Sequence, residues 1–397
     1  MMRKAKAQET KSILLWSALQ LNSRRRSPAR LFGCTLLAMA FAASGASAQT
    51  RSVAATVSAG SQPQSVAVNP VTNKIYVANF KSNSVTVIDG ATNATVTVAV
   101  GKSPLEVAVN PLTNKVYVAN FNGNSVTVID GATNTLTTVA TAANPDAIAV
   151  NSVTDKIYVA NANSNTVTVI DGATNTTAAV ATSANPCAIA VNSVTNSIYV
   201  VNGGSNNVTI IDGATNATAT VAAGSGPISV AVNPVTNKAY VVNFNSNNMT
   251  MIDGATNSIA MVAVGAFPQG LVVNPVTNKI YVGHEGGSGN MTVIDGATNS
   301  TATVTVGWDP LGMAINPVTN QIYTASGINN IVTLVDGATN KVTTTVPVGI
   351  GPSGVAINPN TNKVYVANAF SGTVSVIDGA TNTSPTFAVG GFAVAGQ

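Results

Sequence analysis

The chain has 397 residues, of which 45% are hydrophobic and only 8% are charged. Its formal net charge is +4, but residues 1–48 hold eight basic residues and one acidic residue, so the remainder carries about +4 − 7 = −3. This charge predicts no nucleic-acid binding, and Cys187 is the single cysteine after residue 48, which leaves no partner there for an internal disulfide.

The first 48 residues have the pattern of a secretory signal. Arginines at positions 24–26 and 30 precede an apolar run from Leu31, and small residues follow at Ala46–Ala48. This order predicts a signal peptide over residues 1–48, cut before Gln49, and its apolar run is too short for a membrane span. We therefore expect a periplasmic, secreted or cell-surface protein whose mature part has no membrane span.

Residues 49–397 consist of one unit written eight times. Tyrosines and the aspartates of "IDG" or "VDG" recur in register, with aspartate spacings of 41 or 42 residues. The first copy predicts four strands, at residues 65–69, 74–79, 84–89 and 94–100, because Val and Thr favour strands. The turns between them read "NPVTN" and "GATN", and Asn73 is expected in the left-handed conformation. Four short strands repeated head to tail are typical of β-propeller blades.

The repeat resembles the YVTN-type β-propeller family, which is named for a Tyr-Val-Thr-Asn run. Tyr76–Asn79 reads "YVAN", and Ala or Val usually replaces the Thr in the other copies. The resemblance covers nearly all of residues 49–397 and implies an extracytoplasmic propeller, as in YncE-like and surface-layer-like proteins. It implies a fold more firmly than an activity.

The expected fold is all-β, a single eight-bladed propeller of four-stranded blades. Ser52–Gly60 resembles a fourth strand, whereas the last repeat contains Pro385 at that place. The N-terminal segment is therefore expected to complete the last blade. A seven-bladed ring is the alternative, if one repeat packs irregularly.

Candidate site residues lie in the loops that differ between copies, because loops on a rigid scaffold usually carry recognition. In the sixth repeat His284, the only histidine, and Glu285 replace the common sequence, and Trp308 and Asp309 occupy the next variable loop. These four residues are interpreted as a site for a polar ligand that stacks on the indole. The alternative is a repeat that has drifted in sequence. Four further candidates follow the second strand of their repeats, at positions taken as equivalent, and form an aromatic rim or pack under the loops: Phe80, Phe121, Phe244 and Phe370.

Two functions remain open. Eight of the eleven aspartates after residue 48 belong to turns, and one histidine builds no convincing catalytic set. The first hypothesis is therefore a non-enzymatic binding or scaffold module, a monomer without cofactor or metal, whose partner is a protein, a glycan or a cell-envelope component. The second is a metal-dependent lactonase- or lyase-like enzyme in which Glu106 and Asp146 hold the metal at the channel mouth, which requires a third acid nearby.

Overall fold

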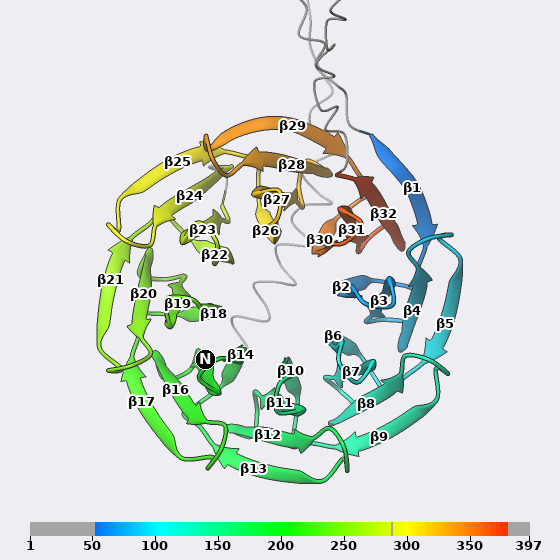
Figure 1. Cartoon of the computed structure of the whole chain (residues 1–397), viewed down its shortest axis with the longest axis horizontal. Helices are drawn as coiled ribbons and strands as arrows, with labels where there is room; N and C mark the ends of the chain where they lie inside the picture. The colour runs from blue at the N-terminus through cyan, green and yellow to red at the C-terminus, as the bar shows by residue number, and fades with distance from the viewer. Residues whose placement is uncertain (1–51, 287–288, 380–397) are drawn as a thin grey trace, which may run out of the picture. The chain divides into compact units, whose positions relative to one another are not determined.

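The computed structural model describes residues 52–286 and 289–379, and every regular element in these ranges is a β-strand. Its 32 strands form eight four-stranded antiparallel sheets, arranged as the blades of an eight-bladed β-propeller (Figure 1). The predicted fold is confirmed, and the seven-bladed alternative is wrong. The predicted signal peptide, residues 1–48, lies outside the described residues.

Strands A to D of each blade run outward from the centre of the ring (Figure 1). Blades one to four consist of β2 (Pro63–Asn69), β3 (Lys74–Asn79), β4 (Ser84–Asp89), β5 (Thr95–Ala99); β6 (Pro104–Asn110), β7 (Lys115–Asn120), β8 (Ser125–Asp130), β9 (Leu136–Ala140); β10 (Pro145–Asn151), β11 (Lys156–Asn161), β12 (Thr166–Asp171), β13 (Thr177–Ala181); and β14 (Pro186–Asn192), β15 (Ser197–Asn202), β16 (Asn207–Asp212), β17 (Thr218–Ala222).

Blades five to eight follow the same order, except that the last strand of blade eight comes from the start of the described chain. They consist of β18 (Pro227–Asn233), β19 (Lys238–Asn243), β20 (Asn248–Asp253), β21 (Ile259–Ala263); β22 (Pro268–Asn274), β23 (Lys279–His284), β24 (Asn290–Asp295), β25 (Thr301–Thr305); β26 (Pro310–Asn316), β27 (Gln321–Ser326), β28 (Ile331–Asp336), β29 (Lys341–Pro347); and β30 (Pro352–Asn358), β31 (Lys363–Asn368), β32 (Thr373–Asp378), β1 (Val53–Ser58).

The A strands begin two residues before the predicted start. In blade one the strand starts at Pro63 rather than Ser65, and its register against β3 shifts between these two residues. A bulge of this kind changes which side chains face the centre of the ring. The residues before each predicted A strand therefore belong to the wall of the central channel.

The ring is closed by β1, which pairs with β32 as the outer strand of blade eight, as predicted. In blade one, Asp89 N donates to Ala94 O and Val100 N donates to Asn83 O. Residue pairs of two antiparallel strands alternate between hydrogen-bonded and non-hydrogen-bonded pairs, so Val96 of β5 lies in a hydrogen-bonded pair. In the repeat register Pro385 corresponds to Val96. Because proline has no N–H to donate there, the N-terminal strand is the better partner for β32.

The repeated tyrosines form the core between the blades. All eight are buried, with at most 1% of the side chain exposed. Tyr76 packs with Val107, Val116 and Ile129 of blade two, and the other blades repeat this contact in their own clusters. Each buried tyrosine contributes about 1.5–3 kcal/mol through removal of its ring from water.

The A–B turns join each blade to the next through asparagine side chains. Oδ1 of Asn69 accepts a hydrogen bond from the backbone N–H of Val71 at 3.0 Å, and its Nδ2 donates to Oδ1 of Asn114 in blade two at 2.9 Å. Equivalent side-chain bonds of 2.6–2.9 Å link all eight blades, and the bond from Asn358 to Asn73 closes the circle. Asn73 has φ of 54°, in the left-handed region that was predicted.

The C–D turns are fixed by their aspartates. Oδ1 of Asp89 accepts hydrogen bonds from the backbone N–H groups of Ala91 and Thr92 and from the Thr92 hydroxyl, at 2.8–3.0 Å. These bonds, with the Thr92 backbone first, hold the pKa of Asp89 below its usual value. The residues that every copy repeats are therefore those that shape turns, fill the core or bond the next blade.

Candidate functional site

The two ends of the ring are built differently. The A–B and C–D turns lie at one end, which we call the turn face, and the B–C and D–A loops lie at the other, which we call the loop face. Each A strand starts at a D–A loop, so the first residues of these strands belong to the loop-face end of the channel. Two cavities of the described structure lie toward this face, one in the channel and one at the B–C loop of blade six.

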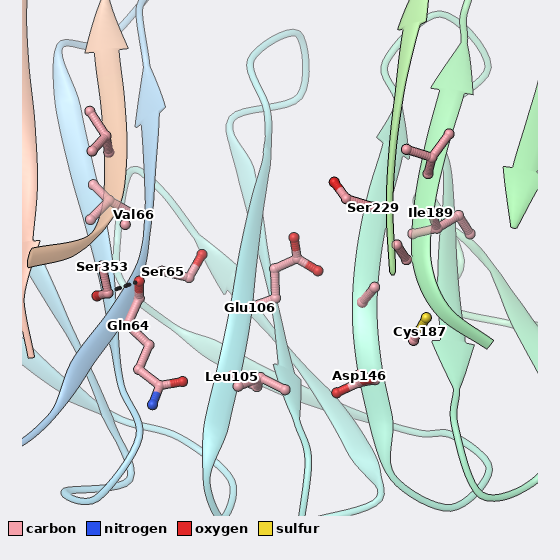
Figure 2. Close-up of a pocket in the computed structure, with 15 residues that line it drawn as sticks. Gln64, Ser65, Val66, Leu105, Glu106, Asp146, Cys187, Ile189, Ser229 and Ser353 are labelled. Atoms are coloured by element: carbon pink, nitrogen blue, oxygen red, sulfur yellow. Dashed lines mark hydrogen bonds between the residues drawn. The ribbon is translucent and has the colours of Figure 1, made fainter. Parts of the chain in front are cut away.

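The larger cavity has a volume of about 600 Å³ and lies in the central channel (Figure 2). It is lined by the second to fourth residues of six innermost strands, β2, β6, β10, β14, β18 and β30. Its polar lining residues are Gln64, Ser65, Glu106, Asp146, Ser229 and Ser353. The structure therefore brings the two channel acids predicted from the sequence to one cavity.

Glu106 is the channel residue with the most altered ionisation. Its Oε2 accepts a hydrogen bond from the backbone N–H of Ile148 in the next blade at 2.7 Å. Burial, and then the nearby charge of Asp146, raise the pKa of Glu106 to about 7, although the bond from Ile148 opposes this shift. The side chain is only partly accessible to water from the channel. Near neutral pH this carboxyl group is therefore divided between its protonated and ionised forms.

Asp146 and Cys187 follow Glu106 on the next two innermost strands. Figure 2 shows Glu106 pointing toward the strand of Asp146, and Asp146 pointing back toward the strand of Glu106. Burial, with a smaller effect of Asp146, raises the pKa of the Cys187 thiol to about 11. Because the thiolate is the reactive form of cysteine, this thiol is a poor nucleophile near neutral pH.

The metal site considered for Glu106 and Asp146 lacks a further ligand of the expected kind. Over residues 52–286 and 289–379, no group of three or more His, Cys, Asp or Glu side chains is placed to hold a metal ion. Calcium takes six to eight oxygen ligands, and two carboxyl groups supply only part of such a set. The described residues therefore supply two of the acidic metal ligands that the enzyme hypothesis requires, but not the third.

The smaller cavity, of about 240 Å³, contains His284 and Glu285 in its lining, together with Phe267. His284 is 1% exposed, and its Nε2 lies 2.8 Å from Oγ1 of Thr292. In six of the other blades an asparagine occupies this place and bonds the corresponding hydroxyl, as Asn79 does with Thr86 at 2.9 Å, and in blade seven the residue is Ser326.

The ionisation of His284 agrees with this buried place. Burial lowers its pKa to about 4, against a smaller opposing effect of the Ala266 backbone. The ring is therefore neutral at pH 7, and it can meet a ligand only through the small cavity.

Trp308 lies on the surface of the loop face, with 53% of the residue exposed. Its backbone is held on both sides, because its N–H donates to Oδ1 of Asn329 at 2.7 Å and its carbonyl accepts from the Ser326 hydroxyl. Asp309 has φ of 62°, and burial raises the pKa of its carboxyl group. The indole is thus the exposed member of this predicted pair.

The four predicted phenylalanines do not form one set. Phe80, Phe121 and Phe244 directly follow their B strands and are half-buried, whereas Phe370 stands one residue further along its loop and is 67% exposed. The predicted equivalence of Phe370 is wrong. In blade eight, Ala369 N makes the bond to a D–A loop carbonyl that Phe80 N makes in blade one, so the next side chain turns outward.

Exposed apolar side chains gather in the loops of blades six to eight. Phe267, Trp308 and Ile350 come from three successive D–A loops and are 44%, 53% and 57% exposed. The Phe267 ring also pairs with Phe244, with ring centroids 5.3 Å apart. We call Phe267, Trp308, Ile350 and Phe370 the loop-face apolar arc. Ile350 was not predicted as a site residue, because an isolated isoleucine has no distinctive sequence pattern. A comparison of all D–A loops at the position of Trp308 would have found it.

The glycines of the blade-six B–C loop fit against this arc. Gly286 and Gly289 have φ of 86° and 59°, in the region that favours glycine. A Cβ atom on Gly286 would lie 3.0 Å from the Phe267 ring, and one on Gly289 would lie 3.0 Å from the Trp308 ring. Because these two glycines have no side chains, the loop backbone can lie directly against the Phe267 and Trp308 rings.

Comparison with solved structures supports the fold. A chain of the structure titled Kuenenia stuttgartiensis hydrazine synthase matches with a TM-score of 0.59 and 24% sequence identity, over 70% of this chain and 96% of that chain. At this identity the likeness shows a β-propeller and nothing about activity. No family model and no curated protein matches the chain. The described ranges contain no helix that is long and apolar enough to cross a membrane.

Proposed function

We propose that the protein is an extracytoplasmic, non-enzymatic binding propeller of the YVTN-repeat type, which recognises its partner through the loop-face apolar arc. The observation that carries the proposal is the gathering of four exposed apolar side chains in the loops of blades six to eight. At the position of Trp308, the D–A loops that lead into blades one to six hold small or polar residues: Ser61, Lys102, Ala143, Ala184, Ser225 and Ala266. Only the loop into blade eight holds another large apolar residue there, Ile350. A binding surface that occupies one sector of the ring explains why these loops differ from the rest.

The partner that suits this surface is a protein or a glycan of the cell envelope. Exposed aromatic rings on a rigid support contact flat apolar surfaces, such as a sugar face or an aliphatic side chain, at low entropic cost. The rigid support is present here, because each loop is anchored by backbone bonds such as Phe370 N to Ile350 O at 3.1 Å.

The binding experiment screens the purified protein against immobilised glycans and envelope proteins, and then titrates the hits with two variants. Trp308→Ala should weaken binding about tenfold or more, on the scale of a lost aromatic contact of about 1–3 kcal/mol. Leu112→Ala is the matched control, because Leu112 is 71% exposed on the turn face. Normal binding by Trp308→Ala, together with lost binding by a folded Leu112→Ala protein, would contradict the proposal.

Export is the second part of the proposal, and it rests on the basic, apolar and small-residue order of residues 1–48. N-terminal sequencing of the protein recovered from outside the cytoplasm should begin at Gln49 or within a few residues of it. Uncut protein that stays in the cytoplasm would contradict this part and leave the loop-face proposal standing.

The alternative function is a metal-dependent hydrolase or lyase at the channel mouth. The raised pKa of Glu106 favours it, because catalytic acids and bases often have a pKa near the working pH. Assays of lactone and glycoside hydrolysis with added Ca²⁺, Mg²⁺ or Zn²⁺ test it. Turnover that is lost in Glu106→Gln and kept in Trp308→Ala would replace the binding proposal by this one.

A further inference from the structure

The channel cavity is asymmetric, because the innermost strands approach each other closely on one side of the ring. Gly270, Gly312 and Gly354 occupy the third position of their A strands in blades six to eight. A Cβ atom on Gly312 would lie 2.0 Å from the Ser353 carbonyl oxygen, and one on Gly354 would lie 2.4 Å from the Gln64 carbonyl oxygen. Neither β22 nor β26 lines the cavity, so its open space lies toward blades one to five and blade eight.

The charged groups of the cavity wall also lie on one side of the cavity. Among its 15 lining residues the two carboxyl groups, Glu106 and Asp146, stand on the neighbouring strands β6 and β10, and no lining residue is lysine or arginine. The rest of the wall is apolar or carries hydroxyl, amide or thiol groups, with Ile189, Val230 and Val355 among the apolar side chains. A ligand that fits this wall has a positive end and an apolar body.

We propose that the channel cavity is a binding site for a small organic cation, whose ammonium or guanidinium group lies between Glu106 and Asp146 and whose body packs against the apolar wall. This site is separate from the loop-face apolar arc and goes beyond the proposed function. A volume of about 600 Å³ is within the range of small-molecule pockets, and it far exceeds the space that a single metal ion fills.

The hydrogen bonding of Glu106 leaves room for such a ligand. Its Oε2 is committed to the backbone N–H of Ile148, which leaves Oε1 for a donor in the cavity. Ammonium and guanidinium groups donate several charge-assisted hydrogen bonds, and such bonds are stronger than neutral ones. A metal site in this cavity lacks a third carboxylate ligand. An organic cation does not need one, because it brings its own hydrogen-bond donors.

The ionisation of the site supports the same ligand class. The titratable groups that line the cavity with Glu106 are Asp146, whose charge raises the pKa of Glu106, and the Cys187 thiol, which stays protonated near pH 7. A cation beside the two carboxyl groups would favour the ionised form of Glu106. Binding near pH 7 should therefore release part of a proton to the solvent.

The test is isothermal titration of the full chain with butylamine, putrescine and agmatine at pH 7, in two buffers of different ionisation enthalpy. Butanol and calcium chloride are the comparison ligands. We expect saturable binding of at least one amine, proton release that the two buffers reveal, and no binding of butanol. Glu106→Gln and Asp146→Asn should each weaken amine binding about tenfold or more.

The matched control is Asp212→Asn, which removes one negative charge on the turn face and keeps an oxygen that can accept the turn bonds. Amine binding unchanged in this variant and weakened in the two channel variants supports the proposal. Three outcomes would overturn it: no amine binds, the channel variants bind amines as the unaltered protein does, or calcium alone binds and depends on Glu106. Melting curves of all variants show whether any loss reflects unfolding.

Discussion

The two faces of the ring use their exposed side chains in opposite ways. On the turn face seven blades expose the same kind of aliphatic residue, 70–77% exposed, at Val71, Leu112, Val153, Val194, Val235, Val276 and Val318. On the loop face the large exposed apolar residues are two phenylalanines, a tryptophan and an isoleucine, and all four fall in the loops of blades six to eight. The residues that the blades repeat include those that make the blade-to-blade hydrogen bonds of the turns. Residues vary between blades in the loops, where those bonds are not required. An exposed large apolar residue in this protein is therefore informative only where its equivalents in most other blades are small or polar.

The carboxyl groups of the turns and of the channel show the same contrast. The turn aspartates of blades one to seven have a lowered pKa because backbone N–H groups, such as that of Thr92 to Asp89, stabilise the ionised form. Glu106 has a raised pKa because burial destabilises its ionised form. Turn carboxylates therefore stabilise the fold when charged, whereas Glu106 stabilises it when neutral.

The largest expected effect of a point change is at a repeated core position. Tyr158→Ala should lower the free energy of unfolding by about 3–5 kcal/mol, because it leaves a cavity between two blades that cannot fully collapse. Urea denaturation followed by circular dichroism measures this value. A loss below about 1 kcal/mol would contradict the claim that the repeated tyrosine is the main blade contact.

Glu106 should make stability depend on pH. The folded protein keeps this proton up to about pH 7, whereas the unfolded chain releases it near the ordinary value of 4.5. The stability gained from the protonated form is complete below pH 4.5 and falls as pH rises toward 7, by on the order of 3 kcal/mol.

The comparison of Glu106→Gln with the unaltered protein isolates this effect. Denaturation midpoints measured from pH 5 to pH 8 should decline less in the variant, because glutamine does not titrate. Parallel pH curves for the two proteins would show that Glu106 is not the group responsible.

A smaller effect is expected for the bond that closes the ring on the turn face. Asn358→Ala removes the bond to Asn73 and the bond from Asn360 N, and should cost about 1–2 kcal/mol. The matched change on the loop face is Asn122→Ala, which removes one exposed bond to Ser103 and should cost less than about 0.5 kcal/mol. Equal costs at the two positions would remove the energetic difference between the faces.

The smallest effect on stability is expected at the residue on which binding depends most. Trp308→Ala keeps the backbone bonds to Asn329 and Ser326 and exposes little new surface, since the indole already faces water. Its unfolding free energy should change by less than about 0.5 kcal/mol. A loss of several kcal/mol would mean that Trp308 is a structural residue of the loops.

The repeats made the fold predictable, because each strand, turn and core tyrosine was stated eight times. The candidate site was less predictable, because its residues occur once. His284 was singled out as exceptional, yet its ring takes over the buried place of an asparagine, which only the contact with Thr292 reveals. Glu106 and Asp146 were named from the sequence, but the bulge after the A-strand proline and the close approach at Gly312 set the cavity around them.

The most direct test of the central claim is a footprint of the bound partner on the unaltered protein, measured by carbene labelling and mass spectrometry. The partner found in the binding screen should protect Trp308, Ile350 and Phe370 from labelling and leave the turn residues Leu112 and Val235 unchanged. Protection of the turn residues, with the loop-face apolar arc still labelled, would contradict the claim that recognition belongs to the loop face.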